Sequence, residues 1–444
     1  MRRLNYVRLL GSAFHMLRHT LGGMVFLAAV VALAGIRDDP GLETRIARPS
    51  PLLGVASPSS DLVAQVSPSD DLQPPRQGPQ VEATGPAEPL ASGDPASSVV
   101  AVGPTPAPQA PQGRPVAPPI PRQGGYIIIP KARLATLPVT GPAWQALKAA
   151  ADGSAGTPDL SNQDQDNNVF VLAKALVYAR TREPRYRDEV VANLKAAIGT
   201  EGGRTLALGR EIGAYVLAAD LIDLSVIDPS FDAQTFRPWL RSLLSLPLEG
   251  LTLQTTHEQR ANNWGTQAGA SRAAIAAYLG DATELARVAQ VFKGWLGDRT
   301  SYAGFSYGDL SWQADPVHPV GINLVGATID GIDVDGSLPE EMRRGGTFRW
   351  PPAPTDYPWG ALEGAILQAE ILYQAGYDAW NWENQALERA YEFLLNRANW
   401  RPAGNDEWQL WLVDYRYGSI SWAGSPGPYG KNFGWSDWLY APGS

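Results

Sequence analysis

The sequence predicts a mostly α-helical protein, and three features point to that class. Segments with apolar residues at helical spacing follow one another from about residue 140 onward, separated by breakers such as Pro184 and Gly202-Gly203. Alternating apolar and polar runs, which would predict strands, form no comparable series. The chain also lacks the fixed-period repeat that a helical solenoid requires. We therefore expect successive antiparallel helix pairs in an (α/α) toroid, whose inner helices surround a cleft.

The helices can be placed by their apolar faces. Residues 187–198 carry Val190, Leu194 and Ile198 on one side, and further helices are expected at 169–180, 210–223, 236–246, 264–279, 283–296, 359–375 and 384–396. Long loops are expected at 297–359 and 400–444. Both loops are rich in Trp and Tyr, which argues against disorder and favours either a sugar-stacking surface or aromatic core residues beneath the loops.

The first 122 residues are predicted to lie outside the folded domain. Four arginines precede residues 21–36, an uncharged apolar run, and this order is typical of an export signal. The run is shorter than the roughly 20 residues of a spanning helix. Residues 1–36 are therefore expected to be either a cleaved signal peptide or a retained membrane anchor. Residues 37–122, rich in Pro, Ser and Ala, predict a disordered linker, and the toroid is expected at 123–444.

Composition limits the location and the partners. The chain has no cysteine and a net charge of −9, and residues 1–122 hold ten Arg and nine Asp or Glu, which leaves about −10 for the rest. A cysteine-free chain with an export leader is typical of a bacterial extracytoplasmic protein, secreted or anchored to the outer face of the membrane. The acidic balance argues against a nucleic-acid partner, and it weighs against a polyanionic substrate unless basic groups gather in one cleft. We expect a monomer that needs no metal and no other cofactor.

Two motif blocks carry the functional signal. Residues 257–280 contain Asn262-Asn263-Trp264-Gly265 at the start of a predicted helix, and residues 335–346 contain Asp-Gly-Ser-Leu-Pro-Glu-Glu followed by Arg343-Arg344. The chain then continues to Tyr357-Pro358-Trp359. Over about residues 140–400 this pattern resembles the alginate-lyase superfamily of helical-toroid polysaccharide lyases. Two departures stand out: Trp264 occupies a position where relatives usually have His, and residues 347–356 contain an insertion.

The resemblance implies β-elimination on a uronic-acid polymer such as alginate or glucuronan. Removal of the C5 proton needs donors that stabilise charge on the adjacent carboxylate, as an oxyanion hole does, and the resemblance assigns this role to Asn263 and Arg344. It implies that Tyr357 is the base and the acid. A tyrosine has an ordinary pKa near 10, so it needs a nearby cation such as Arg344 before it can act as a base.

The other residues expected at the substrate are less specific. One asparagine suffices to cap a helix, which leaves the second of the pair for another role. His257 and His318 are alternative bases, although an isolated histidine is more typical of a structural residue or a hydrogen-bonding contact. The expected substrate contacts are Asn262, Trp264, His257, Arg343, Arg349, Trp359 and His318.

Two other functions remain open on the sequence alone. Helical toroids also serve inverting glycoside hydrolases, which use two carboxyl groups on opposite sides of the scissile bond. The acidic balance suits that alternative, and its candidate residues are Asp309, Asp315, Asp335, Glu340 and Glu341. A non-catalytic glycan-binding module would be consistent with the missing histidine.

Overall fold

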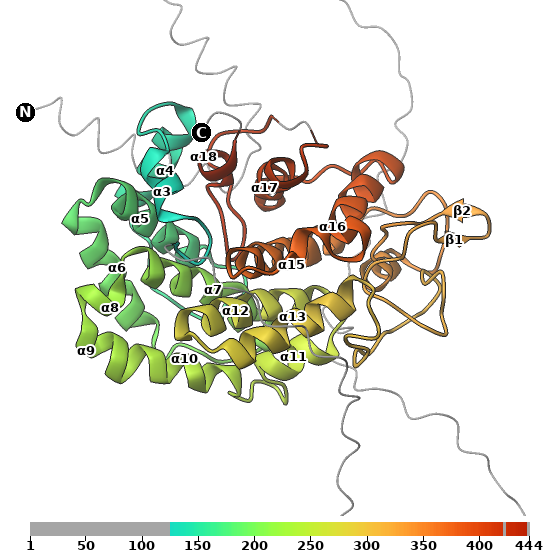
Figure 1. Cartoon of the computed structure of the whole chain (residues 1–444), viewed down its shortest axis with the longest axis horizontal. Coiled ribbons are helices and arrows are strands. Elements are labelled where there is room, and N and C mark those ends of the chain that lie inside the picture. Colours follow the sequence, from blue (N-terminus) through green and yellow to red (C-terminus); the bar gives the residue numbers. More distant parts are fainter. Residues whose placement is uncertain (1–124, 421–422, 442–444) are drawn as a thin grey trace, which may run out of the picture. The chain divides into compact units, whose positions relative to one another are not determined.

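The computed structural model describes residues 125–420 and 423–441, all within the compact unit formed by residues 100–444 (Figure 1). The leader expected at 1–36 and the linker expected at 37–122 lie outside the described residues. Among the helices that are described, none is long and apolar enough to cross a membrane.

The described chain is mostly helical, as the sequence predicted. Its two strands, β1 (Thr328–Ile329) and β2 (Ile332–Asp333), form one short antiparallel pair. The helices before this pair are α3 (Lys131–Thr136), α4 (Pro142–Asp152), α5 (Asn167–Thr181), α6 (Pro184–Ala197), α7 (Thr205–Leu221), α8 (Leu224–Ile227), α9 (Pro229–Phe231), η2 (Asp232–Phe236), α10 (Arg237–Leu244), α11 (Leu253–Gln259), α12 (Asn263–Leu279) and α13 (Ala282–Leu296). Those after it are α14 (Pro339–Met342), η3 (Arg343–Gly345), α15 (Tyr357–Gln374), η4 (Ala379–Asn381), α16 (Trp382–Glu392), η5 (Phe393–Arg397), η6 (Gly404–Asp406), α17 (Trp408–Tyr417) and α18 (Ser436–Tyr440).

Four helices form the interior of the unit. Helix α7 packs against α5 and α12, and α12 packs against α15, so that α7, α12 and α15 lie at the centre of Figure 1. These helices are apolar or small-residue on nearly every face, as expected of helices that are covered on all sides. Outer helices such as α6 and α10 bury one face only.

Small residues set the spacing of the inner helices. A Cβ atom placed on Gly364 of α15 would lie 2.4 Å from the carbonyl carbon of Thr266 of α12. A Cβ atom on Gly209 of α7 would lie 3.0 Å from the backbone nitrogen of Ala268. Side chains at these two glycines would force the helices apart, so the close contact between backbones requires glycine there.

The three central helices run in the same direction. Gly209 of α7 meets Ala268 of α12, and Gly213 further along donates its N–H to Ser271 Oγ at 3.1 Å. On the other side of α12, the Gln267 amide donates to the Gly360 carbonyl oxygen at 3.1 Å. The amino-terminal parts of α7, α12 and α15 therefore meet at one end of the interior. Helix amino termini carry free N–H groups and the positive end of the helix dipole, so this end favours negative charge.

Candidate functional site

The two asparagines at the start of α12 have different surroundings. Asn262 is the N-cap, and its Oδ1 accepts a hydrogen bond from the Trp264 N–H at 3.2 Å. Asn263 is the first helical residue and is buried, with 6% of its surface exposed. Its side-chain amide forms no hydrogen bond with any other residue in the described part of the chain. Asn262 therefore caps the helix, and the side-chain amide of Asn263 is not needed for capping.

The second motif block docks directly onto this helix start. Glu341 of α14 is buried, and its Oε1 accepts the hydrogen bond donated by the Asn263 backbone N–H. The neighbouring Glu340 accepts hydrogen bonds from the Gly308 N–H at 3.0 Å and from the Arg343 guanidinium. Burial raises the pKa of Glu341 to about 8, while the Asn263 N–H and Arg344 act in the opposite direction.

Arg344 and Tyr357 form a pair next to this contact. The Arg344 guanidinium carbon lies 4.2 Å from the centroid of the Tyr357 ring, in cation–π geometry. Tyr357 is the first residue of α15 and is partly exposed. The structure therefore places a cation on the face of the Tyr357 ring.

Asn263 lies at the same end of α15 as this pair. The Asn263 Nδ2 atom is 3.8 Å from the point where a Cβ atom on Gly360 would lie. Tyr357 and Gly360 are three residues apart on one helix and are therefore neighbours on its surface. Asn263, Arg344 and Tyr357, separated by more than 90 residues along the chain, are thus brought together where α12 and α15 begin.

Trp264 and Trp359 do not offer the stacking face expected of them. Trp264 is 8% exposed, with the Arg260 guanidinium 5.3 Å from its ring centroid. Trp359 is 3% exposed and packs against the ring of Tyr391 at 5.8 Å. Both side chains are core residues, because the helices that carry them are covered on all sides. Neither ring is therefore available for stacking on a sugar.

The two histidines expected at the substrate, His257 and His318, differ in their surroundings. His257 is 3% exposed, and its Nδ1 is 3.3 Å from a guanidinium nitrogen of Arg272. Burial lowers its pKa well below the ordinary value, with Arg272 acting in the same direction, so the ring is neutral and enclosed. His318 lies on an exposed turn, where its Nδ1 is 2.9 Å from Asp315 Oδ2. Neither position supports a direct contact with a sugar beside Asn263.

The two remaining arginines differ in their surroundings. Arg343 is bound to Glu340, and its Nε is buried without a hydrogen-bond partner among the described residues. Arg349 is exposed on the segment between η3 and α15. Arg343 therefore borders the cluster through Glu340, whereas Arg349 is placed on the surface.

The polar cluster extends further than the sequence indicated. Glu363 of α15 is buried, and its oxygens accept hydrogen bonds from Trp408 Nε1 at 2.9 Å and Gln267 Nε2 at 3.3 Å. Burial and the nearby Glu363 raise the pKa of Asp406 to about 8, and Arg210 and Lys431 counteract this rise. Sequence reasoning missed these residues because they come from five separate parts of the chain.

Most of the acidic residues proposed for a hydrolase hold loops together. Asp309 accepts a hydrogen bond from the Ser311 N–H, and Asp335 is bound to Arg389 and the Gly326 N–H. Asp315 pairs with His318, and Glu340 with Arg343. Glu341 alone of the five contacts Asn263, and it is fully enclosed. Across the described residues, no group of three or more His, Asp or Glu side chains is placed to hold a metal ion.

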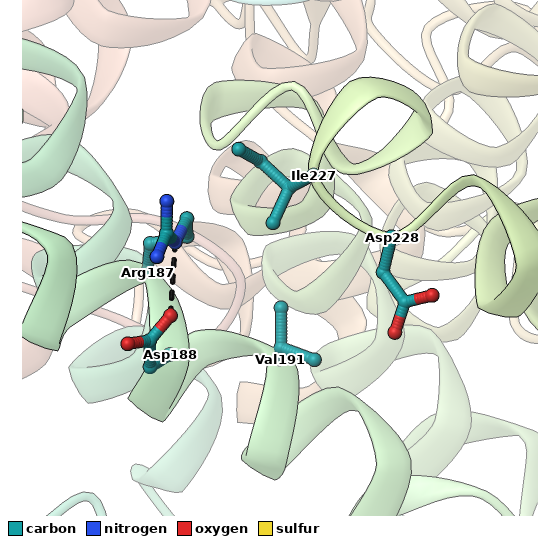
Figure 2. A pocket seen from close by; sticks show the side chains of 5 residues that line it. All are labelled: Arg187, Asp188, Val191, Ile227 and Asp228. Atoms are coloured by element: carbon teal, nitrogen blue, oxygen red, sulfur yellow. Dashed lines mark hydrogen bonds and ion pairs between the residues drawn. The ribbon is translucent and has the colours of Figure 1, made fainter.

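Two open hollows lie elsewhere on the described unit. One hollow, of about 320 Å³, is lined by Arg187, Asp188, Val191, Ile227 and Asp228 of the α6 to α8 region; Figure 2 shows these five side chains. Its one internal ion pair, Arg187–Asp188 at 2.9 Å, lies on the surface. A second hollow of about 480 Å³ is lined partly by Lys431 and Tyr429. Of these two hollows, only the second is lined by a residue near Glu363 and Asp406, namely Lys431.

Comparison with known proteins places the second motif block in a family. Residues 320–403 match the family model described as alginate lyase. The matched segment contains Arg343, Arg344 and Tyr357, so the resemblance to the alginate-lyase family is confirmed over that region. No curated protein and no solved structure matches the chain. In general terms, the family match supports polysaccharide lyase activity.

The environment of Glu341 leads to a pH-dependent prediction. Its pKa is about 8 in the folded protein and near 4.5 in the unfolded chain. Between these values the unfolded chain releases a proton that the folded protein retains, so rising pH favours unfolding. The protonated Glu341 carboxyl makes its full contribution to the free energy of unfolding below about pH 4.5. This contribution falls by up to about 1.4 kcal/mol per pH unit as the pH rises towards 8. Glu341→Gln should remove this slope and gain stability relative to the wild type as pH rises.

Denaturant unfolding of both proteins at several pH values between 4.5 and 8 checks the prediction. Glu249→Gln, on an exposed turn, is the matched control and should follow the wild-type curve. Parallel curves for the wild type and Glu341→Gln would contradict the assignment.

Proposed function

We propose that this protein is a polysaccharide lyase that cleaves a uronic-acid polymer by β-elimination. The Arg344–Tyr357 pair beside the free amide of Asn263 carries the proposal, because it combines a base, a cation and a carboxylate donor at one point. Tyr357 takes the C5 proton, the bond from C4 to O4 breaks, and a double bond forms between C4 and C5. The same hydroxyl then returns a proton to the departing O4. Asn263 and Arg344 stabilise the charge that develops on the carboxylate.

The local charge supports an acidic substrate despite the acidic overall composition. The cluster lies where α7, α12 and α15 begin, and it contains Arg210, Arg344 and Lys431. Buried acids nearby have raised pKa values, as shown for Glu341 and Asp406, so they add less negative charge at neutral pH. These cations offer a polyanion favourable contacts on a negatively charged protein.

We further propose that the helical pairs form an incomplete (α/α) toroid, with the inner helices α5, α7, α12 and α15 in sequence around the site. Export through the leader expected at residues 1–36 would bring the enzyme to an extracellular polymer. A linker at 37–122 would hold the domain away from the membrane or wall if the leader is retained.

Incubation with a panel of uronic-acid polymers tests the proposed reaction. Alginate or glucuronan should yield new reducing ends together with ultraviolet absorbance from the unsaturated product. A carboxyl-reduced polymer should yield neither, because its C5 proton is no longer activated by a carboxylate. Reducing ends without the absorbance would indicate a hydrolase instead, and no cleavage of any polymer would indicate a binding module.

A further inference from the structure

Arg210 and Asn263 both lie close to Gly360. It belongs to the second turn of α7, and its Nη2 atom is 3.9 Å from the point where a Cβ atom on Gly360 would lie. The Asn263 Nδ2 atom is 3.8 Å from the same point. Two side-chain donors from different helices therefore border one small space over the first turn of α15, and the absence of a side chain at Gly360 keeps that space open.

The Arg210 guanidinium is not neutralised by a partner. Its Nε is buried and has no hydrogen-bond partner, and it forms no ion pair with a carboxylate within 4.0 Å in the described part of the chain. Glu363, the buried acid of α15, already accepts hydrogen bonds from Trp408 and Gln267. Burial raises the pKa of Glu363 and raises that of Asp406 to about 8, while Arg210 acts in the opposite direction on both. The guanidinium thus keeps both its charge and free donors, and its planar fork matches a carboxylate.

We propose that Arg210 and Asn263 together bind the carboxylate of the reacting uronate in the space over Gly360. The inference rests on the proposed lyase function and deepens it, because it identifies the group that makes the enzyme require a uronate. Arg344, stacked on Tyr357 at 4.2 Å, lies beside the same site. Arg210 then joins Asn263 and Arg344 as a further donor to the carboxylate.

The first test measures binding separately from catalysis. In the Tyr357→Phe background, Arg210→Gln should weaken binding of alginate or glucuronan oligosaccharides roughly 10- to 100-fold, the range for a lost hydrogen bond to a charged group. Binding of the carboxyl-reduced oligosaccharide should change little, so discrimination between the two ligands falls by a similar factor. Arg241→Gln, on the exposed side of α10, is the charge-matched control and should leave both affinities unchanged. An equal loss for the two ligands would overturn the proposal.

The second test uses Gly360→Ala, because this variant should fold. The nearest atoms to the new methyl group would be the two donor nitrogens at 3.8 and 3.9 Å, which is ordinary van der Waals distance. Alanine also favours a helix more than glycine does, so the melting temperature should hold or rise. Affinity for the polyuronate should nevertheless fall at least about 10-fold, because the methyl group fills the space between the donors. Wild-type affinity in a folded Gly360→Ala protein would contradict the proposal.

These assays separate this inference from the proposed function. If binding depends on Arg210 but the protein cleaves no polyuronate, the carboxylate site is supported and the lyase function is refuted. If the wild type catalyses elimination, but Arg210→Gln still prefers the uronate oligosaccharide over the carboxyl-reduced one as strongly as before, only the carboxylate site is refuted. If the wild type binds none of the polyuronates, both are wrong.

Discussion

Tyr357→Phe should reduce elimination to background while leaving polymer binding nearly unchanged. Only the hydroxyl group is lost, and in the proposed reaction this group both removes the C5 proton and protonates O4. Proton transfer by a positioned side chain typically contributes about 10²–10⁴-fold, and here one residue performs two transfers. The phenylalanine ring keeps the face on which Arg344 stacks at 4.2 Å, so the local packing should persist. Initial rates from ultraviolet absorbance and affinities from calorimetric titration give the two quantities.

The histidines provide the comparison. His318→Ala removes an exposed side chain and should leave turnover unchanged. His257→Ala should affect stability more than chemistry, because it opens a cavity beside Arg272 in the interior. Full lyase activity in Tyr357→Phe would end the proposed mechanism and return the two histidines as candidates for the base. A hydrolase would tolerate Tyr357→Phe and lose activity instead on replacement of Asp309, Asp335 or Glu341.

The helices that could be predicted are those with a regular apolar pattern. The helix expected at 264–279 is found at Asn263–Leu279, and the one expected at 359–375 begins two residues earlier, at Tyr357. The predicted loop at 297–359 contains only the short pair β1–β2 and the short helices α14 and η3 before α15. These two helices were predictable because each is a long apolar run bounded by breakers, which indicates a helix even where it is covered on all sides.

The carboxyl-terminal region departs from the prediction. Residues 400–444 were expected to be a long loop, yet α17 and α18 lie within them. Aromatic residues are only moderate helix formers, so a run such as Trp408–Tyr417 gives a weak local signal. Tertiary packing decides the outcome, because Trp408 and Trp438 are both about 1% exposed. The tryptophans that suggested a sugar-stacking surface are largely core residues beneath the loops.

The candidate site could be predicted only where its signals are local. The Asn262 cap is a property of one helix start, and the segment carrying Arg344 and Tyr357 has a family pattern of its own. Arg210 and Lys431 have no such signal, since they are more than 200 residues apart and meet only in the folded protein. Which arginine faces Gly360 depends on the alignment of α7 with α12, which no pattern within either helix specifies.

Asn263→Ala should lower turnover by roughly 10²–10³-fold, or about 2.7–4 kcal/mol, the usual cost of one lost donor to a developing oxyanion. The side-chain amide is lost, whereas the backbone N–H that binds Glu341 remains in the alanine variant. Alanine is also well tolerated within a helix, so the unfolding transition should shift little. Because the donor matters most as charge develops, kcat and kcat/KM should fall together.

Asn262 is the matched control, because the adjacent asparagine caps the same helix. Asn262→Asp keeps an oxygen for the Trp264 N–H and should preserve the cap, whereas Asn262→Ala should cost about 0.5–2 kcal/mol of stability. Both Asn262 variants should retain far more turnover than Asn263→Ala when assayed well below their melting temperatures. If Asn262→Ala and Asn263→Ala instead lost equal activity and equal stability, the shared defect would be the helix start, and the catalytic role of the Asn263 amide would be refuted.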